Sequence, residues 1–349
     1  MNTGSHFDVR GLFFVIRVTL LCSVLFLAAS RADFFLGDST FEYSKEALVI
    51  NADTVGEKIE DTPEKDIVTL AFVGDIMLDR GVEAEIIRHA GGKFSFPFEF
   101  VKEEFLKYDL VFGNLEGVIS DKGFDRRDLY SFRMNVEALP ALKEAGFDIL
   151  SVANNHSDDW GREAFEDMLG RFKSEGIVYV GGGFTEGEAY GGKSVKINDL
   201  KITFLAFSDF DTFLKADGAV SGEALIDEEK LANYVGFAQI QNDIVVVSFH
   251  FGEEYQSLPN KRQIQLSRLA IEAGADLVVG HHPHVIQPLE KYQNRYIAYS
   301  LGNFIFDQYF SDETMEGGLL EVEIEGKSIK NARLKKVLLN KHYQPSLEK

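Results

Sequence analysis

Short apolar runs alternate with longer mixed segments along most of this chain, and this alternation is the feature that most restricts its fold. The apolar runs, each of strand length, cover residues 67–73, 110–113, 149–153, 178–180, 202–206, 244–249, 277–279 and 296–300. The segments between them favour helices at residues 83–90, 97–106, 136–144, 163–175 and 261–273. Such alternation is typical of an α/β protein whose large sheet is mostly buried. Two later runs, residues 319–324 and 333–339, are expected to be closing strands of the same domain.

The composition allows a large core and excludes some functions. With 349 residues, 45% of them hydrophobic, the chain can bury a substantial interior. A formal charge of −20 argues against nucleic-acid binding, which requires a basic face, so no nucleic acid is expected among the partners. Cys22 is the single cysteine, so no disulfide can form within the chain, and any metal ion must be held by nitrogen and oxygen atoms.

The first 66 residues differ from the rest of the chain. Residues 18–29 form an apolar run behind Arg10 and Arg17, which predicts a signal peptide or an N-terminal membrane anchor within residues 1–32. Residues 33–66 are acidic and poorly periodic, and we interpret them as a linker to a domain that spans residues 67–349. A cleaved signal and a retained anchor are both open, and either one places the domain outside the cytoplasm.

Polar side chains follow the predicted strands at the points where the strands end. They are Asp75, Asn114, Glu116, Asn155, His156, His250, His281, His282 and His284. Ligands of α/β sheets bind at the carboxyl ends of the strands. Buried imidazoles need polar partners, and neutral imidazole is the commonest protein ligand of transition ions. If the strands are neighbours in space, the sequence predicts a metal site at this edge of the sheet.

Each of these residues also has a purely structural explanation. Asp75 and Asn155 could cap helices, and His250 could be a core histidine whose hydrogen bonds are satisfied. Asp158 or Asp159 could orient His156, as carboxylates behind a functional histidine often do, although exposed loop acids are the preferred interpretation. The joint pattern favours a single site over a series of independent structural roles.

The same motifs resemble those of a known family. Gly74-Asp75-Ile76-Met77-Leu78, Gly113-Asn114-Leu115-Glu116, Ala153-Asn154-Asn155-His156, His250 and His282-Pro283-His284-Val285 occur in the order typical of the CapA-type capsule-synthesis family. That family is associated with poly-γ-glutamate capsule production and belongs by fold to the calcineurin-like metallophosphoesterases. The resemblance covers roughly residues 68–306. It implies a four-layer α-β-β-α sandwich of the metallophosphoesterase type with two divalent metal ions, whose identity among Mn, Fe, Zn and Mg the spacing leaves open.

The resemblance also implies roles for individual residues. The metal ligands would be Asp75, Asn114, Glu116, Asn155, His250, His282 and His284, and the catalytic residue that protonates the leaving group would be His156. Three positions depart from the pattern of the wider metallophosphoesterase superfamily: Met77 stands where a histidine is usual, Asn114 where a bridging aspartate is usual, and His281 falls outside the pattern. Asp79 and Arg80 are candidates for substrate binding, with a surface ion pair as the alternative.

Three functions follow from these features. The first is an exported, metal-binding component of poly-γ-glutamate capsule biosynthesis, with an anionic polymer as substrate, capsule-synthesis subunits as partners and the N-terminal segment as the contact with the membrane. The second is an extracytoplasmic phosphoesterase, in which two metal ions activate the attacking water. The third is a non-catalytic scaffold subunit with a vestigial pocket. An acidic protein repels a polyanion, so the first function requires metal ions and a local basic groove, for which the candidates are Arg126, Arg127, Arg133, Lys261 and Arg262.

Overall fold

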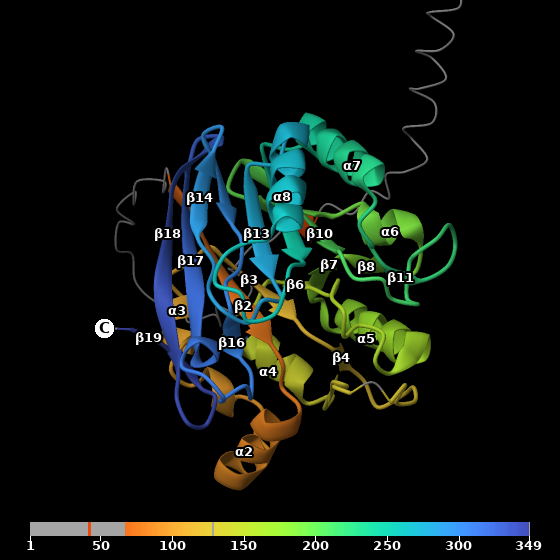
Figure 1. Ribbon diagram of the computed structural model, residues 1–349, viewed down its shortest axis with the longest axis vertical. Helices are drawn as coiled ribbons and strands as arrows, with labels where there is room; N and C mark the ends of the chain where they lie inside the picture. Colours follow the sequence, from red (N-terminus) through yellow and green to blue (C-terminus); the bar gives the residue numbers. More distant parts are fainter. Residues whose placement is uncertain (1–40, 43–66, 128, 349) are drawn as a thin grey trace, which may run out of the picture. The chain divides into compact units, whose positions relative to one another are not determined.

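The computed structural model of this protein describes residues 41–42, 67–127 and 129–348 (Figure 1). The predicted signal peptide or anchor at residues 1–32 lies outside the described residues, as does most of the predicted linker. Within the linker interval, Phe41–Glu42 form a short strand, β1, which pairs with a strand of the domain. In the part of the chain that the structure describes, no helix combines the length and apolar character needed to cross a bilayer.

The first of two large sheets, here called the β2 sheet, contains the first strand of the domain. Its order is β19 (Pro345–Leu347), β18 (Ser328–Leu339), β17 (Glu316–Glu325), β2 (Ile67–Ile76), β3 (Leu110–Leu115), β6 (Ile149–Ser151) and β7 (Val178–Val180), and β16 (Asn303–Ile305) pairs with β2. The strands from β2 to β7 run parallel, whereas β17, β18 and β19 pair in antiparallel fashion. The parallel strands of this sheet therefore end at the same edge.

The second large sheet, here called the β12 sheet, packs face to face against the first. Its order is β1, β9 (Lys193–Ile197), β10 (Leu200–Ser208), β12 (Ile244–His250), β13 (Leu277–His281), β15 (Arg295–Ala298) and β14 (Leu289–Tyr292). The strands β10, β12, β13 and β15 run parallel. Two small pairings lie outside the sheets, between β4 (Val118–Ile119) and β5 (Arg133–Met134) and between β8 (Gly182–Gly183) and β11 (Gly222–Glu223).

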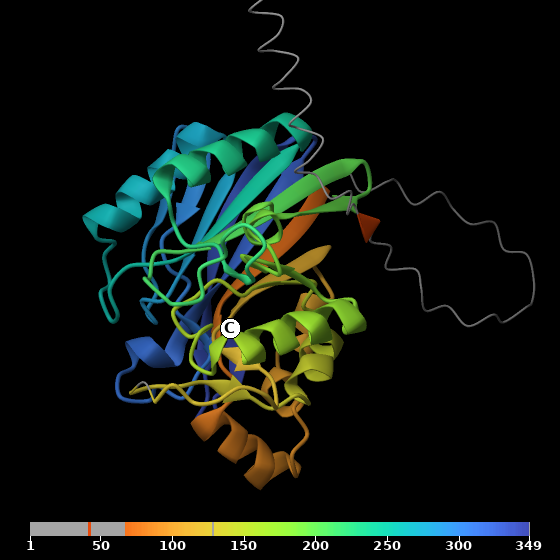
Figure 2. The same cartoon turned by 90° about the vertical axis from the view of Figure 1, so that its right-hand side faces the viewer.

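Helices cover the outer face of each sheet (Figure 2). The outer face of the β2 sheet packs against α2 (Arg80–Ala90), α3 (Lys102–Phe105), α4 (Ala138–Ala145) and α5 (Gly161–Glu175). The outer face of the β12 sheet packs against α6 (Glu186–Tyr190), α7 (Glu228–Gln241) and α8 (Lys261–Ala273). A separate hydrophobic cluster fills the space between the two sheets. The architecture is thus a four-layer α-β-β-α sandwich, and the predicted fold is confirmed.

Alternating side chains explain why the central strands are buried on both faces. On β2, Phe72 faces the space between the sheets, where its ring centroid lies 5.5 Å from that of Phe112 and 6.4 Å from that of Phe204. The next residue, Val73, packs against the helices instead. A strand that is buried on both faces reads as a continuous apolar run, which is why these strands are visible in the sequence.

Four of the five predicted helices correspond to α2, α4, α5 and α8, and one does not. Residues 261–273 were predicted as a helix and form α8, but the single helix predicted at residues 97–106 is wrong. That segment divides into a 3₁₀ turn, η1 (Phe96–Phe98), which has Pro97 in its first turn, and the short α3. The helix α7 was missed, although Asp227 caps it through the N–H groups of Glu229 and Lys230.

Candidate metal centre

The carboxyl ends of the parallel strands bring the predicted ligands together between the two sheets. In the β2 sheet, Asp75 lies directly opposite Asn114 in the register between β2 and β3. In the β12 sheet, His250 lies opposite His281 in the register between β12 and β13. The loops that follow these strands carry the remaining residues of what we call the central site, which comprises Asp75, Asn114, Glu116, Asn155, His156, His250, His281, His282 and His284.

Asp75 contacts several other residues of the central site and is fully buried. One carboxylate oxygen accepts a hydrogen bond from Nδ2 of Asn114 at 2.9 Å, and the other accepts one from the backbone N–H of His282 at 3.2 Å. Nδ1 of His281 lies 3.4 Å from Oδ1, and Nδ1 of His284 lies 3.5 Å from Oδ2. Burial raises the pKa of Asp75, but the two imidazoles outweigh this effect and hold that pKa well below its ordinary value. Asp75 is therefore ionised.

A chain of polar contacts continues from Asp75 across both sheets. Nδ2 of Asn114 lies 3.3 Å from Nδ1 of His250, and Nε2 of His250 lies 2.7 Å from Oδ1 of Asn155. Burial lowers the pKa of His250 well below its ordinary value. Burial, together with the nearby His284, also lowers the pKa of His282 to about 3. Both rings are therefore neutral near pH 7, and neutral imidazole is the form that binds metals.

Glu116 is buried with no hydrogen-bond partner among the described residues for either carboxylate oxygen. Its Oε1 lies 3.7 Å from Nε2 of His156 and 3.7 Å from Nε2 of His284. Burial, reinforced by the negative charges of Asp75 and Glu254, raises the pKa of Glu116 well above its ordinary value. A carboxylate in such a position is costly unless a cation lies beside it.

His156 is held in one orientation by Asp159. Its Nδ1 lies 2.9 Å from Oδ2 of Asp159, which also accepts a hydrogen bond from the backbone N–H of Phe132 at 2.7 Å. The ring centroid of Phe132 lies 4.0 Å from that of the imidazole. Because Nδ1 is held by Asp159, Nε2 is the nitrogen that faces Glu116. The preferred interpretation of Asp158 and Asp159 as exposed loop acids is wrong, because both are buried behind this loop.

The donor atoms of the central site fit divalent cations. Two overlapping groups have their ligand atoms within 4.8 Å of one another: Asp75, Glu116 and His284 form one, and Glu254, His282 and His284 form the other. Several buried atoms have no hydrogen-bond partner in the described part of the chain, namely both carboxylate oxygens of Glu116, Oδ1 of Asn114, Nδ1 of His282 and Nε2 of His281. Carboxylate and imidazole ligands suit Mn, Fe and Zn, and a cation beside Asp75, Glu116 and His284 would compensate the buried carboxylate of Glu116.

All seven predicted metal ligands meet in the central site, together with residues that were not predicted as ligands. His281 is fully buried beside Asp75, although it falls outside the superfamily pattern. Asn303, on β16, accepts a hydrogen bond from Nδ1 of His284 at 3.0 Å. Glu254 approaches His282 and His284, and the signal for it was its position just after the strand that ends at His250. A polar residue in the loop after a ligand-bearing strand is a weak signal alone.

The backbone of the histidine run adopts an uncommon conformation. His282 has φ of 97° and His284 has φ of 58°, both in the left-handed region that side chains other than glycine seldom occupy. Residues held in such conformations cluster at functional sites, where the surrounding structure imposes them. Gly74, next to Asp75, permits the required close packing, because a Cβ there would lie 1.9 Å from the carbonyl oxygen of Gly302.

The two residues predicted to bind substrate lie near His156. Asp79 caps α2 by accepting a hydrogen bond from the N–H of Arg80 at 2.7 Å, and it accepts another from the N–H of Arg133 at 2.8 Å. The guanidinium of Arg80 pairs with Asp307 at 2.9 Å and lies 5.2 Å from the ring centroid of Phe132. The ion pair is the structural alternative that the sequence offered, and contact with substrate stays a prediction.

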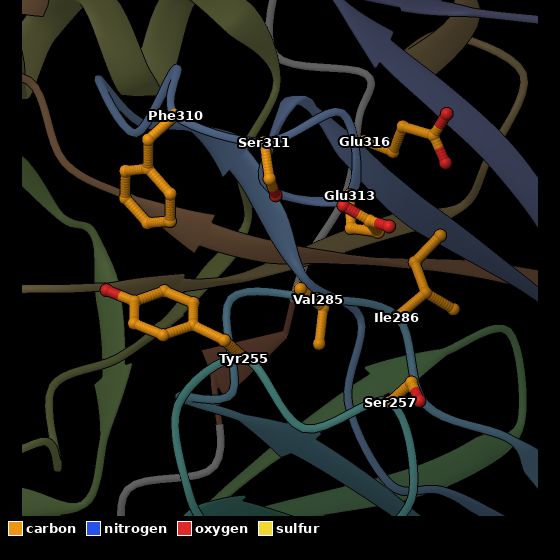
Figure 3. A pocket seen from close by; sticks show the side chains of 8 residues that line it. All are labelled: Tyr255, Ser257, Val285, Ile286, Phe310, Ser311, Glu313 and Glu316. Carbon is orange, nitrogen blue, oxygen red and sulfur yellow. The ribbon is translucent and has the colours of Figure 1, made fainter.

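A pocket of about 450 Å³ opens beside the histidine run (Figure 3). It is lined by Tyr255, Ser257, Val285, Ile286, Phe310, Ser311, Glu313 and Glu316. The ring of Tyr255 stacks over His284 with centroids 6.1 Å apart and meets the ring of Phe310 edge-on at 5.1 Å. Both aromatic rings are substantially exposed, so the pocket offers an amphipathic surface next to the central site.

Comparison with known proteins identifies the family of this chain. Residues 69–308 match the family described as bacterial capsule synthesis protein PGA_cap. The chain is 36% identical over 268 residues to the PGA biosynthesis protein CapA of Bacillus subtilis (strain 168), a match that covers 76% of this chain and 70% of that protein. It is 33% identical over 270 residues to the capsule biosynthesis protein CapA of Bacillus anthracis, covering 75% of this chain and 65% of that protein.

A solved structure shares the fold. The crystal structure of a hypothetical protein from Thermus thermophilus matches with a TM-score of 0.50 at 17% sequence identity, covering 77% of this chain and 98% of that one. At this identity the likeness concerns the fold alone. The family itself is shown by the match of residues 69–308 and by the identity with the CapA proteins. This chain belongs to the bacterial capsule synthesis protein family PGA_cap.

Proposed function

We propose that this chain is an exported, metal-binding component of poly-γ-glutamate capsule synthesis. Its membership of the PGA_cap family and its likeness to two CapA proteins support the role in capsule synthesis. A capsule forms outside the cell, so an extracytoplasmic or membrane-associated location fits that role. The N-terminal apolar run at residues 18–29 would supply export or anchoring.

The observation that carries the metal-binding proposal is the pair of ligand groups that share His284. Because Nδ1 of His284 donates to Asn303, only its Nε2 can bind an ion, so Asp75, Glu116 and His284 would hold one divalent ion. The neighbouring His282 and Glu254 would contribute to a second ion beside it. Asn114, Asn155 and His250 lie in contact with this group. When bound, such ions polarise a substrate oxygen and lower the pKa of a coordinated water.

The chain's own residues favour a second candidate function, hydrolysis of a phosphoester outside the cytoplasm. Asp159 holds Nδ1 of His156, which leaves Nε2 facing Glu116 and available to donate a proton to a leaving-group oxygen. Asn154 fixes the same loop, because its Nδ2 donates to the carbonyl oxygen of Leu115 at 2.8 Å and its Oδ1 accepts from the N–H of His156 at 3.1 Å. A non-catalytic scaffold subunit would not require a proton donor that is held in this way.

Recognition of an anionic polymer would depend mainly on the ions. Of the basic positions proposed for a groove, Arg126 pairs with Asp158 at 2.6 Å, and Arg262 pairs with Asp209 at 3.1 Å as well as with Glu228. These pairs cancel most of the positive charge that the arginines would otherwise offer to a polyanion. A dependence of polymer binding on divalent ions therefore follows from the proposal.

The test uses the full chain, stripped of metal and then reloaded. We expect about two ions at the central site of the wild type, a lower metal content in Asp75→Asn, and an unchanged content in Glu103→Gln, a control on the exposed side of α3. Binding to poly-γ-glutamate should require the ions, and hydrolysis of an aryl phosphodiester, where it occurs, should be lost in His156→Ala while the metal content persists. A metal content well below one ion per chain would contradict the proposed centre.

A further inference from the structure

A second group of metal-ligand side chains lies outside the central site. It consists of Glu85 and His89 on α2 and His342 in the segment between β18 and β19. Within the described part of the chain, every histidine belongs either to the central site or to this group. None of the three residues belongs to the motifs that identify the family, and the proposed function makes no use of them.

The donor atoms of this group already have the spacing of a metal site. Glu85 and His89 stand four residues apart on α2, so they lie on the same face of the helix. Oε2 of Glu85 lies 3.2 Å from Nε2 of His89 and 2.5 Å from Nδ1 of His342, and the three ligand atoms all lie within 4.8 Å of one another. Zinc bonds of 2.0–2.1 Å in tetrahedral geometry place neighbouring ligand atoms about 3.3 Å apart. Small side-chain shifts would therefore suffice to enclose an ion.

The surrounding structure holds these side chains in place. Oδ1 of Asn340 accepts hydrogen bonds from the N–H groups of His342 at 2.8 Å and Gln344 at 3.1 Å, which fixes the turn that presents His342. The ring of Phe96 stacks on His89 at 6.3 Å and meets His342 edge-on at 6.4 Å. The two imidazole centroids lie 4.3 Å apart. A site whose ligands are held by packing and hydrogen bonds loses little side-chain entropy when an ion binds.

The solvent exposure and the charge of the three side chains also suit an ion. The side chain of Glu85 is 12% exposed, that of His342 is 24% exposed and that of His89 is 40% exposed, so an ion can enter from solvent and keep a water ligand. Two imidazoles and one carboxylate with an open fourth position form a known ligand set for zinc. Arg88, which pairs with the other oxygen of Glu85, is a nearby cation that opposes binding, and its long exposed side chain can move away.

We propose that Glu85, His89 and His342 form a surface zinc site that joins the C-terminal segment to α2. Because His342 lies beyond β18 while the other two ligands lie on the first helix after β2, an ion bound there would link distant parts of the chain. Zinc should then stabilise the protein independently of the central site.

The experiment compares zinc content in the full chain by equilibrium dialysis. We expect His342→Gln and His89→Gln each to bind one zinc ion fewer per chain than the wild type at the same free zinc concentration. Arg88→Gln should bind zinc about fivefold more tightly, because it removes an exposed like charge. Asp75→Asn, which alters only the central site, should keep the zinc ion that the two histidine variants lose.

The outcomes separate this site from the central one. If His342→Gln disturbs the fold, as circular dichroism would reveal, His89→Gln provides the same comparison on an exposed helix face. The proposal is overturned if both histidine variants hold as much zinc as the wild type. It is also overturned if the ion missing from them is already missing from Asp75→Asn, because that ion would then belong to the central site.

Discussion

Glu116 allows the sharpest test of the central site, because one substitution should have opposite effects with and without metal. Its carboxylate is fully buried, and both of its oxygens lack a hydrogen-bond partner among the described residues. Burial raises its pKa well above the ordinary value of 4.5, so the metal-free folded chain must keep this group protonated. Glu116→Gln replaces it with a neutral amide of nearly the same size. The metal-free variant should therefore be more stable than the metal-free wild type.

The size of the effect follows from the pH scale. Keeping a group of ordinary pKa 4.5 protonated at pH 7 costs at most about 3 kcal/mol, at about 1.4 kcal/mol for each pH unit. In the unfolded chain the carboxyl ionises freely above pH 4.5, so the cost to the folded state grows as the pH rises through that value. Below it the group is protonated in both states, and the difference between wild type and variant should vanish.

The assay is urea unfolding of the full chain in chelator, repeated between pH 4 and pH 8. The variant should have the larger free energy of unfolding at pH 7, by up to about 3 kcal/mol. With divalent ions added, the order should reverse, because the wild type gains binding energy that the amide cannot supply. Glu103→Gln controls for the loss of a glutamate. A metal-free variant that is less stable than the wild type at pH 7 would refute this account of the site.

Three further predictions concern the residues around Glu116 and the core beneath them. His281→Gln should weaken divalent-ion binding at the central site by about 10- to 100-fold, measured by calorimetry, because its imidazole lies 3.4 Å from Asp75. His156→Ala should keep the metal content of the wild type and lose any chelator-sensitive hydrolysis, whereas Asp159→Asn should reduce that hydrolysis by about 10- to 100-fold. Phe204→Ala, between the two sheets, should lower the free energy of unfolding by about 3–5 kcal/mol in a urea titration.

The central strands were predictable because they are apolar runs buried on both faces, whereas β9 and β14 are partly exposed and were missed. The runs at residues 244–249 and 277–279 correspond to β12 and β13, and the run at residues 67–73 forms most of β2. The order of those strands was not predictable, because the sequence does not state which runs pair. The division into two sheets came from a family resemblance instead, since buried strands in either sheet have the same apolar pattern.

The residues of the central site were predictable where they directly follow a predicted strand. Residues that follow an apolar run directly, such as Asp75 and His250, were assigned because the ends of parallel strands converge. Asp158 and Asp159 were misjudged because a carboxylate in a loop after a strand is usually exposed. Only the contacts of Asp158 with Arg126 and of Asp159 with Phe132 show that both are enclosed. Burial of a loop depends on contacts between distant residues, and local patterns do not carry that information.

Met77 and His281 are two positions at which this chain departs from the pattern of the metallophosphoesterase superfamily. That pattern places a histidine at position 77, but Met77 is fully buried in the core, and its sulfur accepts a hydrogen bond from the N–H of Asp79 at 3.1 Å. His281 ends β13 in the other sheet, opposite His250, and its Nδ1 approaches Asp75 to 3.4 Å. A metal ion depends on donor atoms at the right positions, whichever strand supplies them. The change at residue 77 is therefore compatible with an intact centre, and the metal content of His281→Gln tests this directly.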